Sequence, residues 1–523
     1  MSREEKMGTA IAMDRLDEFA SIVTPKAQPP VESQKPQTIY PNKKKILFVT
    51  SELADLIKVG GLGDVSAALP RALSDHHDIR VLIPGYPQVL ESGNPLKIIG
   101  EVQGHAALPA CKIGRMELPD GLIVYVLINP ELYEREGTPY GDSNSRDWPD
   151  NHIRFARLGL AAAAIAAGTA CISWCPDLVH ANDWPAALTP AYMKWQEQST
   201  PCVFTIHNLA YQGLIDMHCS PELALPPEAC GPEGMEFYGK LSLLKAGITY
   251  ADHITTVSHT YAEEITTELF GCGMQGMLQA KTDEGHLSGI TNGIDESWDP
   301  RVDPHLIAGF SVHNLNGKKR NAAYVEELFG LDSDEGPLFA VVSRLVQQKG
   351  IDLTLDVVDT IVKGGGRLAV IGRGEPELEQ ALTEMAKRYP GRVGVKIGFN
   401  ETDARRMFAG SDFLLMPSRY EPCGLSQMYA QRFGSLPIAR KTGGLADTIE
   451  DGVTGFLFRE ATSDSYLDAV QRALNVYQYP ELLNAMRCRA MASPLYWKQS
   501  VEPYAKLYKS LLHEQAQRAR GHY

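Results

Sequence analysis

The sequence predicts an α/β protein with two doubly wound domains in tandem. Short runs of apolar residues, typical of strands buried on both faces of a sheet, alternate with segments whose apolar residues recur at helical spacing. This alternation occurs twice, over residues 43–297 and 337–493, and a polar stretch that contains Pro300 and Pro304 separates the two series. The alternation indicates parallel sheets with helices on both faces.

Length, composition and charge exclude several classes of protein. The chain has 523 residues, 44% of them hydrophobic, which is enough for two or three domains with large cores. A net charge of −14 argues against an extended nucleic-acid-binding surface. The longest apolar stretch, residues 159–172, is too short to span a bilayer, and no signal-peptide pattern is visible. Nine scattered cysteines without a C-x-x-C pair are typical of reduced thiols, so we expect a cytoplasmic protein.

Ordered structure is expected to begin at Lys43. Residues 24–42 are rich in Pro, Gln, Ser and Lys, which predicts a flexible linker within an N-terminal extension, residues 1–42. A helical pattern begins near Leu62 in the first domain. The expected strands of that domain are residues 46–50, 79–83, 123–128, 178–181, 202–206, 254–257 and 289–291.

Residues 298–336 are expected to connect the two domains. The second domain follows over residues 337–493, and a last helical stretch within residues 494–523 could pack across either domain. The expected strands of the second domain are residues 338–342, 367–371, 393–397, 413–416, 436–439 and 455–458. The expected helices lie near residues 352–363, 375–388, 402–409, 424–433 and 463–477.

Polar residues that follow strands are the candidates for a functional site, because ligands of such sheets bind at the carboxyl ends of the strands. Arg344 comes directly after the first expected strand of the second domain, and Lys349 follows five residues later. Two cations at this position suit a diphosphate, since Arg can form paired hydrogen bonds and Lys supplies a point charge. The alternative is ordinary solvated loop charge.

The segment 417–426 also joins a strand to a helix. The carboxylate of Glu421 can hold sugar hydroxyls, and the backbone N–H groups of Cys423, Gly424 and Leu425 can hold phosphate oxygens. Alternatively, Glu421 is only a favourable charge at the start of a helix. A second glycine turn follows the next strand and could complete the same pocket; it comprises Thr442, Gly443 and Gly444.

The first domain offers a glycine-rich loop after its first strand. Gly60 and Gly61 allow the backbone to approach a ligand closely, Lys58 adds a movable positive charge, and Asp64 lies in the helix that follows. The pattern is not G-x-G-x-x-G, so a dinucleotide site and a dehydrogenase are not supported. A tight turn beside a solvated lysine is the alternative.

Two further strands of the first domain end in polar residues. Asp183 ends one of them, and His207 with Asn208 ends another, so these residues are candidates for the opposite wall of the site. The alternative is a structural role, since a lone histidine at a strand end more often forms a structural hydrogen bond than takes part in catalysis.

Several catalytic patterns are missing from the sequence. It has no G-x-S-x-G nucleophile elbow and no G-x-x-x-x-G-K-[ST] phosphate loop. No cluster of His, Asp and Glu predicts a metal site, so we expect no metal and no cofactor. Neutralisation of a diphosphate would then depend on Arg344, Lys349 and helix N-termini.

Eight segments, in this order, resemble those of the bacterial glycogen synthases and plant starch synthases, glycosyltransferase family five. The similarity runs from about Lys44 to about Tyr508. The segments are K-V-G-G-L-G-D-V, H-A-N-D-W, F-T-I-H-N-L-A-Y-Q-G, A-D-H-I-T-T-V-S, N-G-I-D, V-S-R-L-V-Q-Q-K-G, P-S-R-Y-E-P-C-G-L-S-Q and T-G-G-L-A-D-T. The resemblance implies the GT-B fold, with two Rossmann-like domains facing a central cleft and a C-terminal helix that crosses back to the first domain.

The resemblance also implies an activity in glycogen or starch biosynthesis. The donor would be the nucleotide sugar ADP-glucose, and the acceptor would be the non-reducing end of an α-1,4-glucan. Glucose would be transferred with retention of configuration and without a metal, and no nucleic acid or membrane partner is implied. The implied catalytic residues are Lys58, Asp183, His207, Arg344, Lys349 and Glu421.

The implied substrate-binding residues include Phe399, at a position where many relatives have an aromatic side chain that stacks on adenine. The full set is Gly60, Gly61, Asp64, Asn208, Asn292, Phe399, Cys423, Gly424, Leu425, Thr442, Gly443 and Gly444. The sequence departs from the family pattern at Val59, where bacterial enzymes often have Thr, and at Pro185. The alternatives are a UDP-glucose-dependent, sucrose-synthase-like transferase on the same fold and a non-catalytic glucan-binding scaffold.

Overall fold

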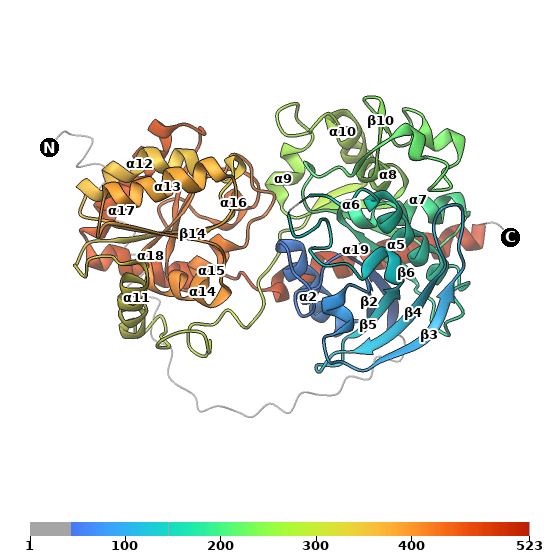
Figure 1. The fold of residues 1–523 in the computed structure, drawn as a ribbon, viewed down its shortest axis with the longest axis horizontal. Helices are drawn as coiled ribbons and strands as arrows, with labels where there is room; N and C mark the ends of the chain where they lie inside the picture. The colour runs from blue at the N-terminus through green and yellow to red at the C-terminus, as the bar shows by residue number, and fades with distance from the viewer. Residues whose placement is uncertain (1–42, 145, 522–523) are drawn as a thin grey trace. The chain divides into compact units, whose positions relative to one another are not determined.

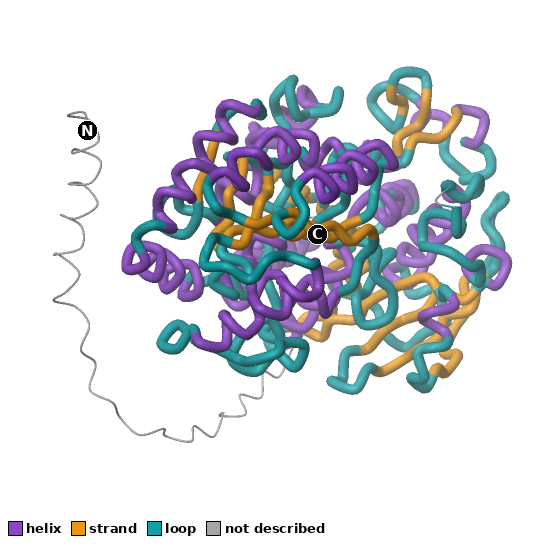
Figure 2. The backbone as a smooth tube through the Cα atoms, turned by 60° about the vertical axis from the view of Figure 1, so that its left-hand side comes forward, coloured by secondary structure: helices purple, strands orange, loops and turns teal. Residues whose placement is uncertain are grey.

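The computed structural model describes residues 43–144 and 146–521 (Figure 1). The predicted N-terminal extension, residues 1–42, lies outside the described residues. Residues from Lys43 onward form two Rossmann-like α/β domains, each with its own large sheet flanked by helices (Figure 2). The predicted fold class is therefore confirmed. Among the helices that the structure describes, none combines the length and the apolar character needed to cross a membrane.

The first domain contains a nine-stranded sheet in the order β12-β11-β7-β6-β1-β2-β5-β4-β3. The seven strands from β12 to β5 are parallel and correspond to the seven predicted ones. The strands are β1 (Lys44–Val49), β2 (His77–Pro84), β3 (Leu96–Val102), β4 (Cys111–Glu117), β5 (Ile123–Ile128), β6 (Leu178–Asn182), β7 (Cys202–Ile206), β11 (His253–Thr256) and β12 (Leu287–Gly289).

The expectation of a wholly parallel first sheet was wrong at one edge. Strands β3 and β4 pair antiparallel with each other, and β4 pairs antiparallel with β5. In β3 only Val102 is buried, and in β4 exposed residues interrupt the buried ones, so neither strand is a continuous apolar run. Such strands belong at a partly solvated edge, where the signal used for buried parallel strands is missing.

Helices cover the first sheet, and a small antiparallel sheet in the order β8-β10-β9 was not predicted. The helices are α2 (Gly61–Ser74), α3 (Pro87–Leu90), α4 (Pro130–Tyr133), α5 (Asn151–Ala166), α6 (Asp183–Ala186), α7 (Leu188–Trp195), α8 (Leu243–Tyr250), α9 (His259–Glu264) and α10 (Gln275–Asp283), with the 3-10 helices η1 (Met217–Cys219) and η2 (Pro227–Cys230). The small strands are β8 (Leu214–Asp216), β9 (Glu236–Phe237) and β10 (Lys240–Ser242).

The second domain contains a six-stranded, fully parallel sheet in the order β15-β14-β13-β16-β17-β18. Its strands are β13 (Leu338–Val342), β14 (Arg367–Gly372), β15 (Val393–Ile397), β16 (Phe413–Met416), β17 (Leu436–Arg440) and β18 (Phe456–Phe458). Its helices are η3 (Gln347–Lys349), α12 (Ile351–Lys363), α13 (Pro376–Arg388), α14 (Glu401–Gly410), α15 (Ser426–Arg432), α16 (Gly443–Thr448), α17 (Ser463–Tyr477) and α18 (Pro480–Ala492).

The segment 298–336, expected as a connection, also contains helix α11 (Asn316–Phe329), which packs against α14. Buried polar side chains anchor this helix. The ammonium of Lys318 is buried and donates hydrogen bonds to the carbonyl oxygens of Ala409 (3.0 Å) and Phe433 (3.1 Å). The polar composition that indicated a loop thus conceals a packed helix.

Strand order reverses once in each sheet. In the first sheet β2 and β5 lie on one side of β1, whereas β6, β7, β11 and β12 lie on the other. In the second sheet β14 and β15 lie on one side of β13, and β16, β17 and β18 on the other. Loops at the carboxyl ends of the strands diverge at such reversals, between β1 and β6 and between β13 and β16, and leave room for a ligand.

The last helix, α19 (Trp497–Gly521), packs on the first domain (Figure 1). Tyr504 and Tyr508 are fully buried, and the hydroxyl of Tyr508 lies 2.6 Å from Nδ1 of His180 on β6. Burial lowers the pKa of His180 to about 3, so the ring is neutral at pH 7. Its other nitrogen, Nε2, lies 2.6 Å from the hydroxyl of Thr205 on β7. Hydrogen bonds thus tie the end of the chain to the centre of the first sheet.

We expect Tyr508→Ala to reduce the free energy of unfolding by about 3–5 kcal/mol, because it removes a buried aromatic ring. Tyr508→Phe keeps the ring but leaves His180 Nδ1 without its partner, and should cost about 1–3 kcal/mol. Urea unfolding followed by circular dichroism measures both, with Lys509→Ala on the exposed face of α19 as the control. Equal stabilities of Tyr508→Phe and wild type would contradict the role given to the hydrogen bond.

Candidate functional site

Loops at the two reversals of strand order bring most of the candidate residues to the carboxyl ends of the strands. The segments that follow β1, β6, β13 and β16 contain, in that order, Lys58, Asp183, Arg344 with Lys349, and Glu421. Contacts join the loops of the two domains. A Cβ atom built on Gly61, after β1, would lie 3.7 Å from Cδ1 of Leu425, after β16.

The glycine loop after β1 is organised by a carboxylate that the sequence analysis did not single out. Glu52 is 3% exposed, and its Oε2 accepts hydrogen bonds from the N–H groups of Val59 (2.7 Å) and Gly60 (2.9 Å). The hydroxyl of Tyr140 donates to the other oxygen, Oε1, at 2.5 Å. Glu52 therefore fixes the backbone of this loop. Its place directly after a buried strand was the only signal in the sequence.

Lys58 and Asp64 form an ion pair, with Nζ and Oδ1 2.7 Å apart. Burial raises the pKa of the Asp64 carboxyl, and the neighbouring Lys58 ammonium opposes this effect. Both sequence-predicted residues thus lie together at the first turn of α2. The positive charge of Lys58 is held beside the glycine loop without a ligand.

Asp183 lies in a strained and buried position at the start of α6. Its φ is 60°, in the left-handed region that non-glycine residues rarely adopt. Its Oδ1 accepts hydrogen bonds from the N–H groups of His207 (3.2 Å) and Asn208 (3.4 Å). Burial nevertheless raises the pKa of Asp183 from 3.8 to about 7. The structure therefore unites these three predicted residues around one carboxyl group.

The imidazole of His207 is held in one tautomer. Its Nε2 lies 3.1 Å from Oδ1 of Asn182, whose amide nitrogen donates to the carbonyl oxygens of Val49 and His180. Because Oδ1 of Asn182 is then the acceptor, Nε2 of His207 carries the proton and Nδ1 keeps a lone pair. Burial lowers the pKa of His207 to about 3, so the ring is neutral at pH 7.

In the second domain, Lys349 and Glu421 form a largely buried ion pair. Lys349 Nζ and Glu421 Oε2 are 2.5 Å apart, and their side chains are 17% and 7% exposed. The hydroxyl of Ser418 donates to the same carboxylate oxygen at 3.1 Å. Arg344 donates from Nη1 to the hydroxyl of Tyr211, in the first domain, at 3.1 Å. Tyr211 is a second residue that the sequence analysis did not single out.

The second glycine turn fits closely under the loop after β16. A Cβ on Gly443 would lie 1.9 Å from the carbonyl oxygen of Glu421, and one on Gly444 would lie 2.2 Å from that of Cys423. Only glycine fits at these two positions. The N–H of Asn292, after β12 of the first domain, donates to the carbonyl oxygen of Val257 at 3.3 Å. The two domains meet at this loop through the hydroxyl of Ser258, which donates to the carbonyl oxygen of Pro422 at 2.5 Å.

Two carboxylates accept hydrogen bonds from the opposite domain. Glu264 of α9 accepts hydrogen bonds from the hydroxyl of Thr442 (2.7 Å) and the N–H of Gly443 (3.1 Å). Asp447 of α16 in turn accepts from the N–H groups of His259 (2.6 Å) and Thr260 (3.1 Å) at the start of α9. The groups of Thr442 and Gly443 that were expected to contact substrate are thus engaged by Glu264.

Phe399 lies apart from these contacts. It follows β15, which β14 separates from β13, and it is 65% exposed. Its role in stacking on adenine remains a prediction. In the part of the chain that the structure describes, one group of side chains has the arrangement of a metal site, and it contains none of the candidate residues: His152, Cys219 and Glu222.

The chain matches two protein families. Residues 45–280 match the starch synthase catalytic domain, and residues 327–490 match the glycosyl transferases group 1. Among similar proteins, the glycogen synthase of Pseudomonas fluorescens is 71% identical over 472 residues, which are 90% of this chain and 97% of the relative. The glycogen synthase of Pseudomonas aeruginosa is 64% identical over 499 residues, 94% of this chain and 97% of the relative.

Two solved structures are similar to this one. The catalytic domain of starch synthase IV from Arabidopsis thaliana, bound to ADP and acarbose, has a TM-score of 0.82 and 28% sequence identity. Sucrose-phosphate synthase from Thermosynechococcus elongatus has a TM-score of 0.56 and 16% identity, a likeness of fold alone. Each comparison covers 90% of this chain and 100% of the other.

The raised pKa of Asp183 predicts how stability depends on pH. The folded protein binds this proton more tightly than the unfolded chain, whose ordinary pKa is 3.8, so the added stability is complete below about pH 4 and is lost as the pH rises towards 7. Asn cannot ionise. We therefore expect wild type to lose stability relative to Asp183→Asn between about pH 5 and pH 7, by at most about 1.4 kcal/mol per pH unit.

Melting temperatures of wild type and Asp183→Asn, measured over this range in one mixed buffer, test the pH prediction. Asp75→Asn, at an exposed aspartate after α2, is the control and should follow wild type. A constant difference between wild type and Asp183→Asn from pH 5 to pH 8 would show that the Asp183 carboxyl does not titrate in this window.

The hydrogen bonds of Glu52 predict a contrast between two variants. Glu52→Ala leaves two N–H groups and a tyrosine hydroxyl without their acceptor, and should lower kcat/KM by up to about 10²-fold through displacement of the glycine loop. Glu52→Gln retains an oxygen for both N–H groups, and its amide can donate to Tyr140, so it should restore most of the activity. Equal losses in steady-state assays of the two variants would argue against this positioning role.

Proposed function

Since the chain belongs to the glycogen and starch synthase family of glucosyltransferases, we propose that it transfers glucose from ADP-glucose to the non-reducing end of an α-1,4-glucan, with retention of configuration. The observation that supports the proposal is the position of Lys58, Arg344 and Lys349 at the carboxyl ends of strands beside the points where the strand order reverses. The bound ADP in the starch synthase IV structure supports an adenine nucleotide donor.

In the proposed mechanism, cationic side chains stabilise the departing diphosphate. Arg344 and Lys349 bind it from the second domain and Lys58 from the first, and Glu421 binds the glucose hydroxyls. As the bond from C1 of glucose to the diphosphate oxygen breaks, the acceptor hydroxyl attacks C1 from the same face. The released diphosphate accepts the proton of that hydroxyl, so no protein nucleophile is required.

The first domain contributes the groups around the reacting glucose. The two N–H groups of the loop after β7 that hydrogen-bond to Asp183 fix this carboxyl in place, and the neutral ring of His207 offers a polar contact without an added charge. We propose that both residues orient the sugar. We also propose that the cationic side chains make a metal ion unnecessary for the transfer. All nine cysteines are free, which supports our proposal of a cytoplasmic location.

The donor assignment predicts the outcome of a panel of purified assays. Glucose incorporation into glycogen should be at least about tenfold faster from ADP-glucose than from UDP-glucose. Arg344→Ala and Lys349→Ala should each lower kcat roughly 10²–10³-fold at saturating donor, because each removes a preorganised charge beside the diphosphate. Lys387→Ala, an exposed cation in the last turn of α13, is the matched control and should retain the wild-type rate.

Three outcomes would contradict the proposal. Transfer from UDP-glucose to fructose would indicate the sucrose-synthase-like alternative. Glycogen binding without turnover on any donor would indicate a scaffold. Wild-type kcat in Arg344→Ala or Lys349→Ala would remove that residue from the mechanism.

A further inference from the structure

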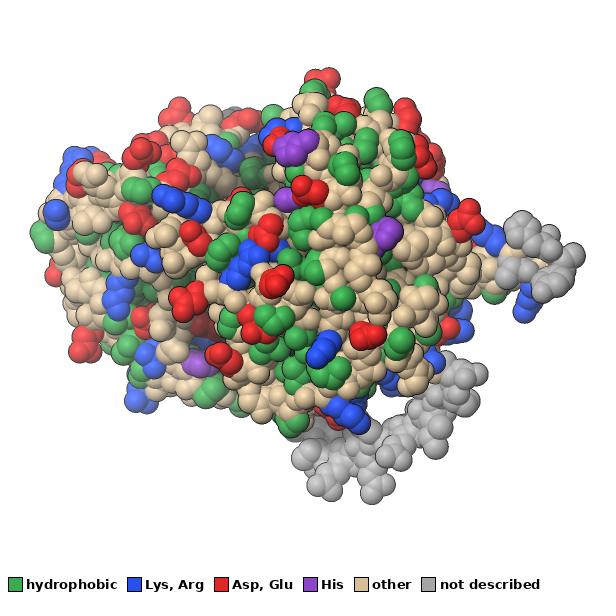
Figure 3. All heavy atoms as spheres, turned by 45° about the vertical axis from the view of Figure 1, so that its right-hand side comes forward, with side chains coloured by type: hydrophobic (Ala, Val, Ile, Leu, Met, Phe, Trp, Pro, Cys, Tyr) green, Lys and Arg blue, Asp and Glu red, His purple; other side chains and the backbone are tan. Residues whose placement is uncertain are grey.

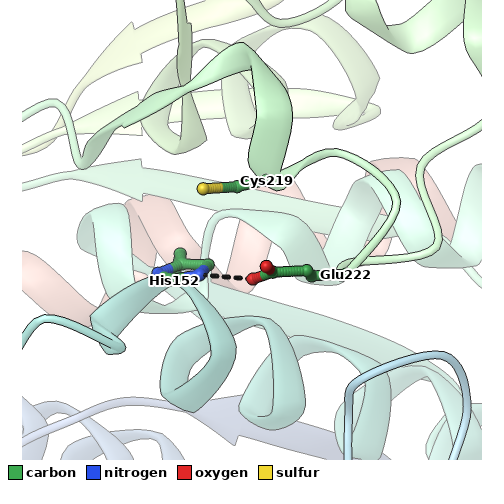
Figure 4. Close-up of side chains that lie close together, drawn as sticks. All are labelled: His152, Cys219 and Glu222. Carbon is green, nitrogen blue, oxygen red and sulfur yellow. Dashed lines mark hydrogen bonds and ion pairs between the residues drawn. The ribbon is translucent and has the colours of Figure 1, made fainter.

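A second group of reactive side chains lies in the first domain, separate from the residues assigned to the donor. His152 is in the first turn of α5, Cys219 ends η1, and Glu222 follows it three residues later (Figure 4). One ligand atom from each, a ring nitrogen, the thiol sulfur and a carboxylate oxygen, lies within 4.8 Å of the other two. Nε2 of His152 and Oε2 of Glu222 are 2.9 Å apart.

We propose that His152, Cys219 and Glu222 bind one divalent transition-metal ion, with Zn²⁺ as the favoured ion and water as the fourth ligand. Imidazole nitrogen, thiolate sulfur and carboxylate oxygen are the ligand types that Zn²⁺ takes in proteins. Metal–ligand bonds of about 2.0–2.3 Å place the ligand atoms of a tetrahedral site about 3.3–3.8 Å apart. The observed separations, 2.9 Å between Nε2 of His152 and Oε2 of Glu222 and at most 4.8 Å for the other two pairs, bracket this range.

The exposure of the three side chains suits reversible binding. Cys219 is 8% exposed and the side chain of His152 is 13% exposed, so two ligands are held by packing. The side chain of Glu222 is 46% exposed and leaves a route for the ion from solvent. On binding, Cys219 releases its thiol proton to water, and Glu222 exchanges its contact with His152 for a bond to the metal.

The backbone around Glu222 is already anchored. Its carbonyl oxygen accepts a hydrogen bond from the N–H of Ala107 at 3.1 Å. The ligands also come from distant parts of the sequence, with His152 and Glu222 70 positions apart. No short C-x-x-C or H-x-x-x-H motif marks them, so only the folded chain reveals the group.

Metal binding at this position would stabilise the segment that carries His207, a residue of the proposed site, and Tyr211, the partner of Arg344. Cys219 and Glu222 lie on the connection that leaves β7 through His207 and Tyr211. His152 lies one turn before Phe155, whose ring packs edge-to-face on Trp184, next to Asp183, with centroids 4.8 Å apart. A metal would therefore join this connection to α5, and we expect it to stabilise the folded protein without taking part in the transfer.

The full chain, stripped with a chelator and kept reduced, should bind one Zn²⁺ per chain in calorimetric titration. Co²⁺ should give the near-ultraviolet charge-transfer band of a thiolate-bound metal. Cys219→Ser should abolish that band, and both Cys219→Ser and His152→Gln should weaken binding by more than about 100-fold, the upper range for loss of an outer-shell partner. Cys272→Ser, which removes an exposed thiol in the same domain, should bind like wild type.

Melting temperatures in chelator identify any variant that fails to fold. A folded wild type that binds no Zn²⁺ would overturn the proposal. A cobalt–thiolate band that persists in Cys219→Ser would assign the metal to another cysteine and would overturn it equally. Because the readouts are binding and absorption, they are independent of the proposed glucosyl transfer.

Discussion

The reversal of strand order beside β1 and beside β13 is the constraint on which the arrangement of charged groups depends. Where the connections of two neighbouring parallel strands run in opposite directions along the sheet, the loops at their carboxyl ends diverge and leave space between them. Polar groups collect there because elsewhere the strands are buried on both faces. The same rule operates in both domains, so the proposed mechanism uses two sets of loops, one from each sheet, for one donor.

The charged groups at these loops already have partners in the protein. Lys58 pairs with Asp64, Lys349 with Glu421, and Arg344 donates to Tyr211. A largely buried ion pair such as Lys349–Glu421 loses much of its Coulombic gain to desolvation, so its value lies in holding both groups in place. Fixed charges of this kind stabilise a leaving diphosphate with little reorganisation. On the face shown in Figure 3, by contrast, charges of both signs are interspersed.

Local patterns predicted the buried parallel strands well because such strands are continuous apolar runs. Strands 338–342 and 413–416 were predicted with their observed bounds. The same signal could not find β3 and β4, where polar residues interrupt the apolar run, or α11, whose buried Lys318 and Asn321 resemble loop residues.

The position of a residue after a strand likewise predicted most candidate residues. The residues that contact them were found only from the folded chain. Three such residues hydrogen-bond to groups that are distant in the sequence or lie across a loop: Glu52, Tyr211 and Glu264. No spacing rule reveals such contacts. The group of His152, Cys219 and Glu222 was hidden for the same reason. Sequence thus indicated which residues lie at the strand ends, and the structure showed which side chains they contact.

A double-mutant cycle of Lys349→Met and Glu421→Gln tests the central claim that these paired side chains act on the donor as one unit. Each single variant should lose roughly 10²–10³-fold in kcat/KM. The double variant should be little worse than the poorer single one, which corresponds to a coupling of about 3–4 kcal/mol. Losses that multiply in the double variant would contradict the claim, because each side chain would then act on the donor without help from the other.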